Sequence, residues 1–166
     1  MEYCFVEFSP KTQDSLFRVN ELFGLIKLAK ESTDTPDEIF LAKQFLDEEK
    51  AYFWNPSAEE QEEWNEFWFP TPISIRHSPQ MPIPPWHFES MLDAFWSGDY
   101  DLIGIKQIEN KYFLLFNPHG YPYGGVDCMV AFLECLGCVV LSIDDWSQEP
   151  YVPSKKTNVW QSKKYK

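Results

Sequence analysis

Apolar and polar residues alternate along residues 102–108 and 111–117, and this pattern predicts two neighbouring β-strands. The two residues between them, Glu109 and Asn110, fit a two-residue hairpin turn, in which Asn110 tolerates the positive φ that such a turn requires. A turn of this length fixes the register, because a slip of one residue would move every side chain to the other face. The predicted pairs are Ile103 with Phe116, Ile105 with Leu114 and Gln107 with Tyr112 on the core face, and Lys106 with Phe113 and Gly104 with Leu115 on the opposite face.

A buried helix and a further strand are expected after the hairpin. Apolar residues recur every three or four positions across residues 126–136, and only Asp127 and Glu134 are charged, which is typical of a helix buried on most sides. Gly137 follows this segment, at a position where left-handed backbone commonly ends a helix. Residues 138–143 form a nearly unbroken apolar run, which predicts an interior strand.

The first half of the chain predicts one strand followed by three helices. Residues 2–8 give a strand that Ser9 and Pro10 are expected to end. Helical spacing then predicts a helix from about residue 10 or 14 to residue 30, with Leu16, Val19, Phe23 and Ile26 on its core side. Two capping patterns predict the next helices: Thr35-Pro36-Asp37-Glu38 opens one that runs to about residue 54, and Ser57-Ala58-Glu59-Glu60 opens one that runs to about residue 67.

Prolines interrupt the helical pattern in the middle of the chain. Six of them lie between residues 70 and 85, so we expect an extended covering segment there, with a short edge strand at residues 73–76. Helical spacing returns from about residue 85 to residue 97, and Gly98 is expected to end this helix. The order of elements predicts an α+β fold, with a small, largely antiparallel sheet of about four strands and helices packed mainly on one face.

The length of 166 residues favours a single domain, which we place at residues 1–149. Residues 150–166 are polar, basic and interrupted by proline, so we expect a loosely ordered tail in which Trp160 is the candidate anchor. No apolar run approaches the ~20 residues of a membrane span, and the segment after Met1 lacks the pattern of a signal peptide. These features predict a cytoplasmic protein.

The charge of the chain is strongly acidic and unevenly distributed. The net charge is −12, but the tail carries five lysines and no acid, so the part before it carries −17. Such a field repels nucleic acid and anionic membrane and favours a basic protein partner. High net charge also keeps proteins soluble, and this simpler explanation remains open.

Cys128 has the best case for catalysis, because it lies in the first turn of the helix predicted at residues 126–136. There the helix dipole lowers a thiol pKa and favours the nucleophilic thiolate. The candidate catalytic partners are His119, nine residues upstream, and the adjacent Asp127. The run Tyr121-Pro122-Tyr123-Gly124-Gly125-Val126-Asp127-Cys128 resembles the local motif of papain-like cell-wall peptidases of the NlpC kind, which also enter the catalytic helix through a Gly-Gly turn and an Asp-Cys pair. The resemblance implies a thiol hydrolase with Cys128 as nucleophile.

The resemblance covers fewer than twenty residues and departs from the family after the cysteine. Met129-Val130 stands where the family has Ser-Gly, and no histidine follows Cys128, so the downstream base of the family has no counterpart. The other interpretation is a structural cysteine in an apolar helix, because free cysteine is among the most buried residue types. We prefer this second interpretation.

Cys135 and Cys138 have the Cys-x-x-Cys spacing of a zinc half-site or a redox pair. However, Cys128 and Cys135 lie two helical turns apart, about 10.5 Å along the axis, whereas thiolates on one zinc lie about 3.8 Å apart. Cys4 is remote in sequence, and disulfides are rare in a reducing cytoplasm. We therefore expect no metal and no other cofactor, with Cys135 and Cys138 lining the core.

Acidic and aromatic residues gather within residues 59–69. The acids are Glu59, Glu60, Glu62, Glu63 and Glu66, and the aromatic residues are Trp64, Phe67, Trp68 and Phe69. A helix with acids on one side and aromatic residues on the other is usually a core helix with a solvated face. The alternative is a docking surface, in which the five glutamates attract a basic protein and Trp64 and Trp68 supply buried area.

Composition favours the docking interpretation, since small acidic proteins that neutralise basic toxins, the immunity-type inhibitors, share this bulk character. We therefore expect a non-enzymatic, acidic protein-binding module of the inhibitor or immunity type. A thiol hydrolase that uses Cys128 is the alternative.

Overall fold

The computed structural model describes residues 2–32, 37–76, 78, 81–82, 86–119, 126–147 and 160. Its strands are β1 (Cys4–Pro10), β2 (Tyr100–Ile108), β3 (Lys111–Pro118) and β4 (Cys138–Asp144). Its helices are α1 (Gln13–Glu31), α2 (Glu38–Gln44), α3 (Asp47–Lys50), α4 (Ala58–Trp68), α5 (Ile73–Arg76), α6 (Phe88–Ser97) and α7 (Asp127–Cys135). No helix in these described ranges is both long and apolar enough to cross a membrane.

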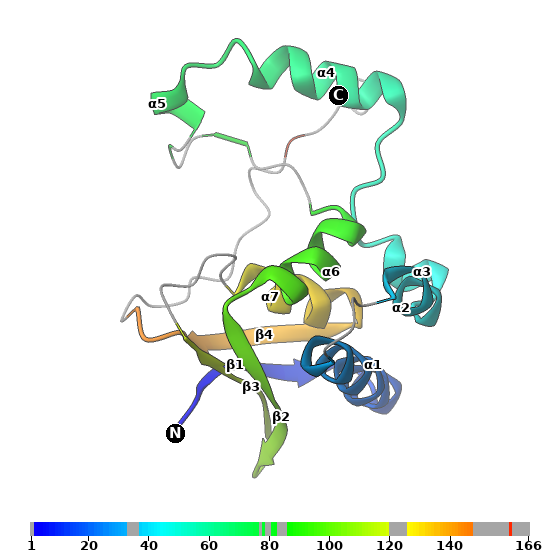
Figure 1. The fold of residues 1–166 in the computed structure, drawn as a ribbon, viewed down its shortest axis with the longest axis vertical. Coiled ribbons are helices and arrows are strands. Elements are labelled where there is room, and N and C mark those ends of the chain that lie inside the picture. The colour runs from blue at the N-terminus through cyan, green and yellow to red at the C-terminus, as the bar shows by residue number, and fades with distance from the viewer. Residues whose placement is uncertain are drawn as a thin grey trace.

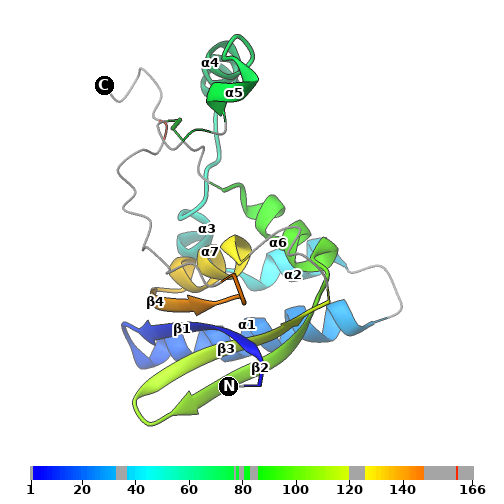
Figure 2. The ribbon, with the colours of Figure 1, turned by 90° about the vertical axis from the view of Figure 1, so that its left-hand side faces the viewer.

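The four strands form one open antiparallel sheet in the order β2-β3-β1-β4, and Figure 2 shows them side by side. The α+β prediction is therefore confirmed. Buried side chains of α1, α6 and α7 join those of the strands in a single apolar cluster. The side chains of Phe5, Phe113 and Leu115 do not belong to that cluster, so the helices cover one face of the sheet.

The hairpin register follows the prediction at four of its five pairs: Ile105 with Leu114, Gln107 with Tyr112, Lys106 with Phe113 and Gly104 with Leu115. The fifth pair was wrong, because Leu102 and not Ile103 lies opposite Phe116. The register shifts between Leu102 and Gly104, and an extra residue of this kind is a β-bulge, which bends a strand. The positive φ of the turn lies at Glu109, at 55°, and not at Asn110 as predicted.

Two predictions about the other strands were also wrong. β1 continues through Ser9 and Pro10, because beyond Phe8 it pairs only with β4, and a proline is tolerated where one side of a strand is unpaired. β4 lies at the edge of the sheet and not in its interior. Its apolar run accordingly divides into buried Cys138 and Val140 and exposed residues between and after them, Val139 and Leu141.

The helix predicted from residue 35 to about residue 54 is divided into α2 and α3. Asp37 caps α2, since its side chain accepts a hydrogen bond of 2.9 Å from the backbone N–H of Phe40, while Thr35 and Pro36 lie outside the described residues. The backbone then becomes extended at Phe45, with φ −83° and ψ 138°.

Side chains from α1 and α3 replace the helical hydrogen bonds at this break. Arg18 donates through Nη2 to the carbonyl of Gln44 at 2.7 Å. It also donates two hydrogen bonds to the Glu49 carboxylate, through Nε and Nη2, both at 2.8 Å. Glu49 in turn accepts a 2.7 Å hydrogen bond from the backbone N–H of Leu46. Because Arg18 belongs to α1, the local sequence pattern of residues 35–54 does not reveal the break.

The remaining helices agree with the prediction more closely, apart from α5. α1 begins after Thr12, and α6 ends at Gly98. The edge strand predicted at residues 73–76 is instead the single helical turn α5, in which the backbone N–H groups of Ile75 and Arg76 donate to the carbonyl of Pro72 at 2.9 and 3.1 Å. Proline fits this position because its fixed φ suits the start of a helical turn.

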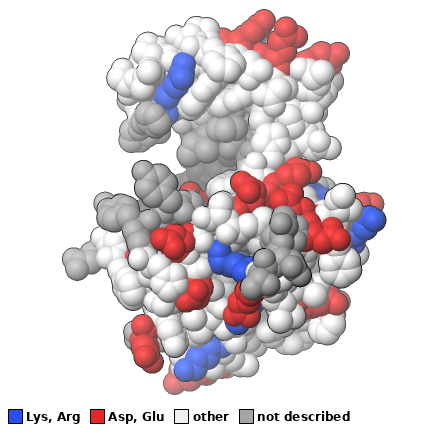
Figure 3. Space-filling model, viewed as in Figure 1, with Lys and Arg blue, Asp and Glu red and all other residues white. Residues whose placement is uncertain are grey.

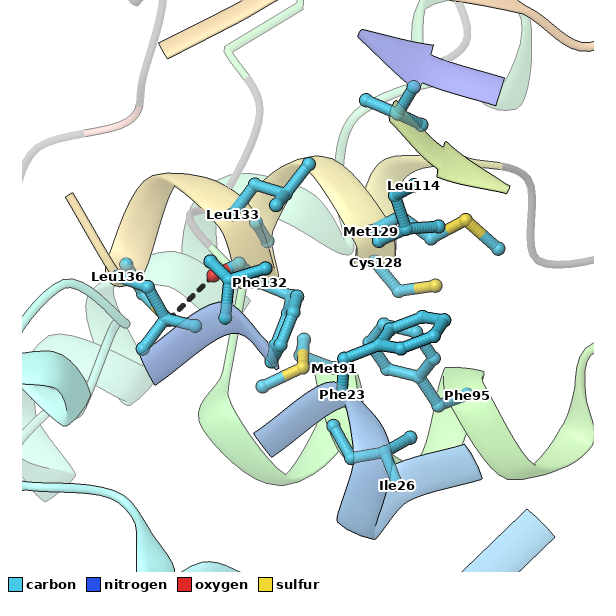
Figure 4. Packing of buried hydrophobic residues seen from close by; sticks show 14 of the residues in the cluster. Phe23, Ile26, Met91, Phe95, Leu114, Cys128, Met129, Phe132, Leu133 and Leu136 are labelled. Carbon is cyan, nitrogen blue, oxygen red and sulfur yellow. Dashed lines mark hydrogen bonds between the residues drawn. The ribbon is translucent and has the colours of Figure 1, made fainter. Parts of the chain in front are cut away.

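α7 is buried between the sheet, α1 and α6, as Figure 4 shows from close by. Met129, Phe132 and Leu133 are completely buried, and the Phe132 ring meets the Phe95 ring of α6 edge to face at 5.6 Å. Gly137 ends the segment with φ 76°, the left-handed conformation that was predicted. The core of the protein is therefore assembled around this helix.

Leu133→Ala is expected to lower the free energy of unfolding by about 2–5 kcal/mol, because it leaves a cavity in a completely buried site. Chemical denaturation followed by circular dichroism measures this loss. Leu141→Ala, which changes an exposed leucine of β4, is the control and is expected to cost less than about 0.5 kcal/mol. An equally small loss for Leu133→Ala would contradict the packing of α7.

Candidate functional site

Helices α4 and α5 stand away from the sheet and the other helices, at the top of Figures 1 and 2. We call residues 57–76, which include both helices, the arm. The start of α4 is fixed by the predicted capping box: Ser57 Oγ accepts from the backbone N–H of Glu60 at 3.2 Å, and the Glu60 carboxylate accepts from that of Ser57 at 2.8 Å. Glu60 therefore has a structural role in the helix start.

The inner side of α4 packs on tryptophans from two other places in the chain, Trp54 and Trp160. Trp64 is 8% exposed and lies outside the main apolar cluster. Its ring stacks on Trp68 at 5.3 Å and meets Trp160 at 5.5 Å and Trp54 at 6.4 Å. Trp160 also contacts Trp54 at 5.8 Å, so the predicted anchor of the tail packs against the base of the arm. The rest of the segment 150–166 lies outside the described residues.

Arg76 ties α5 to the end of α4. Its guanidinium donates to the carbonyls of Thr71 and Phe69, both at 2.8 Å, and lies 5.2 Å from the centre of the Trp68 ring. The guanidinium thus supplies hydrogen bonds to backbone carbonyls at the end of α4 and in the turn after it. The cation–π contact with Trp68 further stabilises the packing of α5 on α4. The two helices form one local unit.

The outer side of the arm carries exposed carboxylates and exposed apolar side chains. Glu59, Glu62 and Glu66 are exposed, whereas Glu60 and Glu63 are half-buried. Figure 3 shows acidic side chains gathered over one end of the arm and mainly uncharged surface over the other. The exposed apolar residues, which we call the apolar tip, are Phe67, Phe69, Ile73 and Ile75.

The tryptophans proposed from the sequence as contact residues are placed on the inner side of the arm. Trp64 is buried, and Trp68 is half-buried beneath Arg76. Phe69 and Ile73 are instead 68% and 71% exposed. Helical spacing contained this information, because Phe69 follows Glu66 by three residues and Glu62 by seven and so shares their side of the helix, whereas Trp64 does not.

Cys128 is completely buried, and its side chain points from α7 toward α1 and α6 (Figure 4). Burial raises the pKa of the Cys128 thiol to about 11, and the neighbouring Asp127 carboxylate acts in the same direction. The expected lowering of this pKa by the helix dipole is therefore outweighed by the loss of water around the sulfur. The hydroxyl of Tyr100 lies 3.4 Å from Cys128 Sγ.

Within the described residues, neither of the other two residues of the hydrolase hypothesis forms a hydrogen bond with this sulfur, whose side-chain partner is Tyr100. His119 is exposed at the end of β3 and pairs through Nε2 with the Asp101 carboxylate at 2.7 Å, which raises the pKa of the histidine. Asp127 is exposed at the start of α7. Within the part of the chain that the structure describes, the contacts do not assemble a cysteine–histidine pair.

Two hollows in the described surface are lined by charged side chains that already form hydrogen bonds or ion pairs within the protein. One, of about 450 Å³, is lined by the Arg18–Glu49 pair together with Phe17 and Leu46. The other, of about 300 Å³, is lined by Lys30, Asp101 and His119, and the Lys30 ammonium donates to the carbonyls of Phe95, Trp96 and Gly98 at 2.7, 3.2 and 2.8 Å. Cys128 lines neither of these hollows. Their cations therefore hold the fold together.

The four cysteines are buried and are not joined by disulfides. Cys135 Sγ donates to the carbonyl of Phe132 at 3.1 Å, within its own helix. In the described ranges no group of three or more His, Cys, Asp or Glu side chains is arranged to hold a metal ion. Comparison with protein-family models, with curated proteins and with solved structures finds no match for this chain.

Cys128 is expected to react slowly with iodoacetamide in the native protein. Raising the pKa of a thiol from 9.0 to about 11 lowers the thiolate fraction at neutral pH by about 100-fold, and burial blocks access as well. Mass spectrometry of peptides after timed labelling should show Cys128 reacting no faster than Cys4, Cys135 and Cys138, while all four react readily in denaturant. Fast and selective labelling of Cys128 would contradict its buried state and support the hydrolase hypothesis.

Trp160→Ala is expected to loosen the arm, because it removes two ring contacts from Trp54 and Trp64. Aromatic pairs contribute about 0.5–1.5 kcal/mol each, so limited proteolysis within residues 57–76 should accelerate about tenfold. Trp146→Ala is the matched control, since Trp146 is exposed on the main body, by which we mean the sheet and the helices other than α4 and α5. Identical cleavage rates for the two variants would show that Trp160 does not hold the arm.

Proposed function

We propose that this protein is a non-enzymatic, acidic binding module of the inhibitor or immunity type that captures a basic protein with the outer side of its arm. The observation that carries the proposal is the continuity of exposed Glu59, Glu62 and Glu66 with the exposed apolar tip. A cytoplasmic location, and the absence of nucleic acid and membrane from the set of partners, are parts of the same proposal.

The charge of the protein supports rapid capture of such a partner. The part of the chain before residue 150 carries −17, and a field of this sign accelerates the approach of a basic surface. Electrostatic complementarity acts mainly on the association rate and on the choice of partner. It is screened by salt, because the Debye length is only about 8 Å at physiological ionic strength.

The apolar tip supports retention of the partner after encounter. Exposed aromatic and aliphatic residues that become buried in an interface supply most of its binding energy, and carboxylates at the rim contribute less. Phe69 and Ile73 are the most exposed members of this set. An apolar group of this kind beside three carboxylates matches a partner that is both basic and apolar.

The inner side of the arm supports a surface that is formed before the partner arrives. Trp64 packs on Trp54, Trp68 and Trp160, and Arg76 closes the turn between the helices. A surface held in place in this way loses less conformational entropy on binding. The tryptophans therefore support binding indirectly, because their packing holds the outer side of the arm in place.

Charge reversal of the exposed glutamates is expected to weaken capture. The protein that the wild type retains from extracts of the native host is purified, and its binding to the wild type is compared with its binding to the variant Glu59→Lys, Glu62→Lys, Glu66→Lys. Its affinity for the wild type is expected to fall at least tenfold between 50 and 500 mM salt, mainly through slower association, because exposed charges are screened. Glu60 and Glu63 are left unchanged, since Glu60 caps α4 and Glu63 is half-buried.

The matched control is Glu2→Lys, Asp93→Lys, Glu109→Lys, which reverses three exposed acids on the main body and gives the same net charge. This control is expected to retain most of the affinity. Binding that is equal at both salt concentrations and indifferent to the reversals on α4 would contradict the proposed function. The acidity would then serve solubility alone.

A further inference from the structure

We infer that the segment of the partner that docks on the arm is a basic amphipathic helix, with its basic residues toward one end of the contact face and its apolar residues toward the other. This inference rests on the proposed function and names the chemistry of the partner segment. It starts from the spacing of four exposed residues of α4, namely Glu59, Glu62, Glu66 and Phe69, which we call the outer stripe.

The outer stripe follows one side of α4 along its length. Its members are separated by three, four and three residues, the spacing that places side chains above one another on a helix. Phe69 keeps helical dihedral angles, with φ −64° and ψ −38°, so it continues the stripe beyond Trp68. At 1.5 Å per residue the stripe is about 15 Å long.

The character of the stripe changes along its length. Its first three members are carboxylates, while its last member belongs to the apolar tip with Phe67, Ile73 and Ile75. Figure 3 shows the same change as acidic surface over one end of the arm and mainly uncharged surface over the other. A complementary ligand therefore carries positive charge along about two helical turns and apolar side chains along the next turn.

A helix meets these requirements better than an extended peptide does. The face of α4 offers side chains only, because the backbone groups of a helix interior are already paired. An extended peptide laid on this face would leave its own N–H and C=O groups without protein partners, whereas a helix satisfies them internally. A helical ligand also presents side chains at the same three- and four-residue spacing as the stripe.

The test uses three synthetic peptides of 14 residues, added to the full-length protein. The first has lysines along two turns of one face and leucines along the following turns of that face; the second has the same composition in scrambled order; the third is oligolysine. Titration calorimetry is expected to give at least tenfold tighter binding for the first peptide than for the other two. Circular dichroism is expected to show that the first peptide gains helix on binding, since isolated helices of this length are marginal in water.

Two pairs of substitutions locate the site. Phe69→Ser, Ile73→Ser is expected to reduce the affinity for the first peptide to that of the scrambled one. The matched control Leu28→Ser, Ile39→Ser changes residues that are 67% and 70% exposed on the main body and should leave binding unchanged. All four residues are exposed, so the fold is expected to survive both changes.

The outcomes separate this inference from the proposed function. Equal affinity for oligolysine and for the first peptide would overturn the inference. A salt-sensitive partner that requires Glu59, Glu62 and Glu66 would still support the proposed function. Equal effects of the two serine pairs would also overturn the inference. A natural partner that ignores both salt and the α4 reversals would remove the function and, with it, the inference.

Discussion

Burial of α7 against the sheet, α1 and α6 is the interaction on which the rest of this structure depends. The helix offers apolar side chains around most of its circumference, and Met129, Phe132 and Leu133 are completely enclosed by its neighbours. The same enclosure keeps Cys128 in the interior, where loss of hydration raises the pKa of its thiol to about 11. The first turn of α7 is therefore enclosed together with its cysteine, whereas the exposed carboxylates of α4 lie on another part of the molecule.

The arm depends on a second and smaller packing interaction. Trp64 lies outside the main apolar cluster and is covered instead by Trp54, Trp68 and Trp160. Because the inner side of α4 is occupied in this way, its outer side faces water with carboxylates and apolar residues together. Exposed apolar groups beside charge are a recurrent property of interaction surfaces.

Most of the fold could be predicted from local patterns, and the exceptions have long-range causes. The alternation of apolar and polar residues and the two-residue turn predicted the hairpin register correctly from the turn to Gly104. Beyond Gly104 a bulge shifts the register, so that Leu102 and not Ile103 lies opposite Phe116. The break between α2 and α3 depends on Arg18, a residue of another helix. β4 lies at the edge of the sheet because it pairs with the edge of β1 that β3 leaves free. The apolar run of β4 does not contain this information.

The candidate site shows the same division. The acidic side of α4 and its capping box were visible in the sequence, since both follow from helical spacing. The same spacing places Phe69 on the acidic side. The residues that cover Trp64 could not be predicted in this way, because Trp54 precedes the helix and Trp160 lies near the end of the chain. Ile73, which lies outside α4, became a contact candidate only when its exposure in the structure was known.

Hydrogen exchange of the protein with and without its natural partner tests the central claim most directly, because exchange reports where on the chain a partner binds. Backbone amides of residues 57–76 are predicted to exchange at least tenfold more slowly in the complex, while those of α7 keep the slow exchange of the buried core. Unchanged exchange throughout the arm, with protection confined to the main body, would contradict the account.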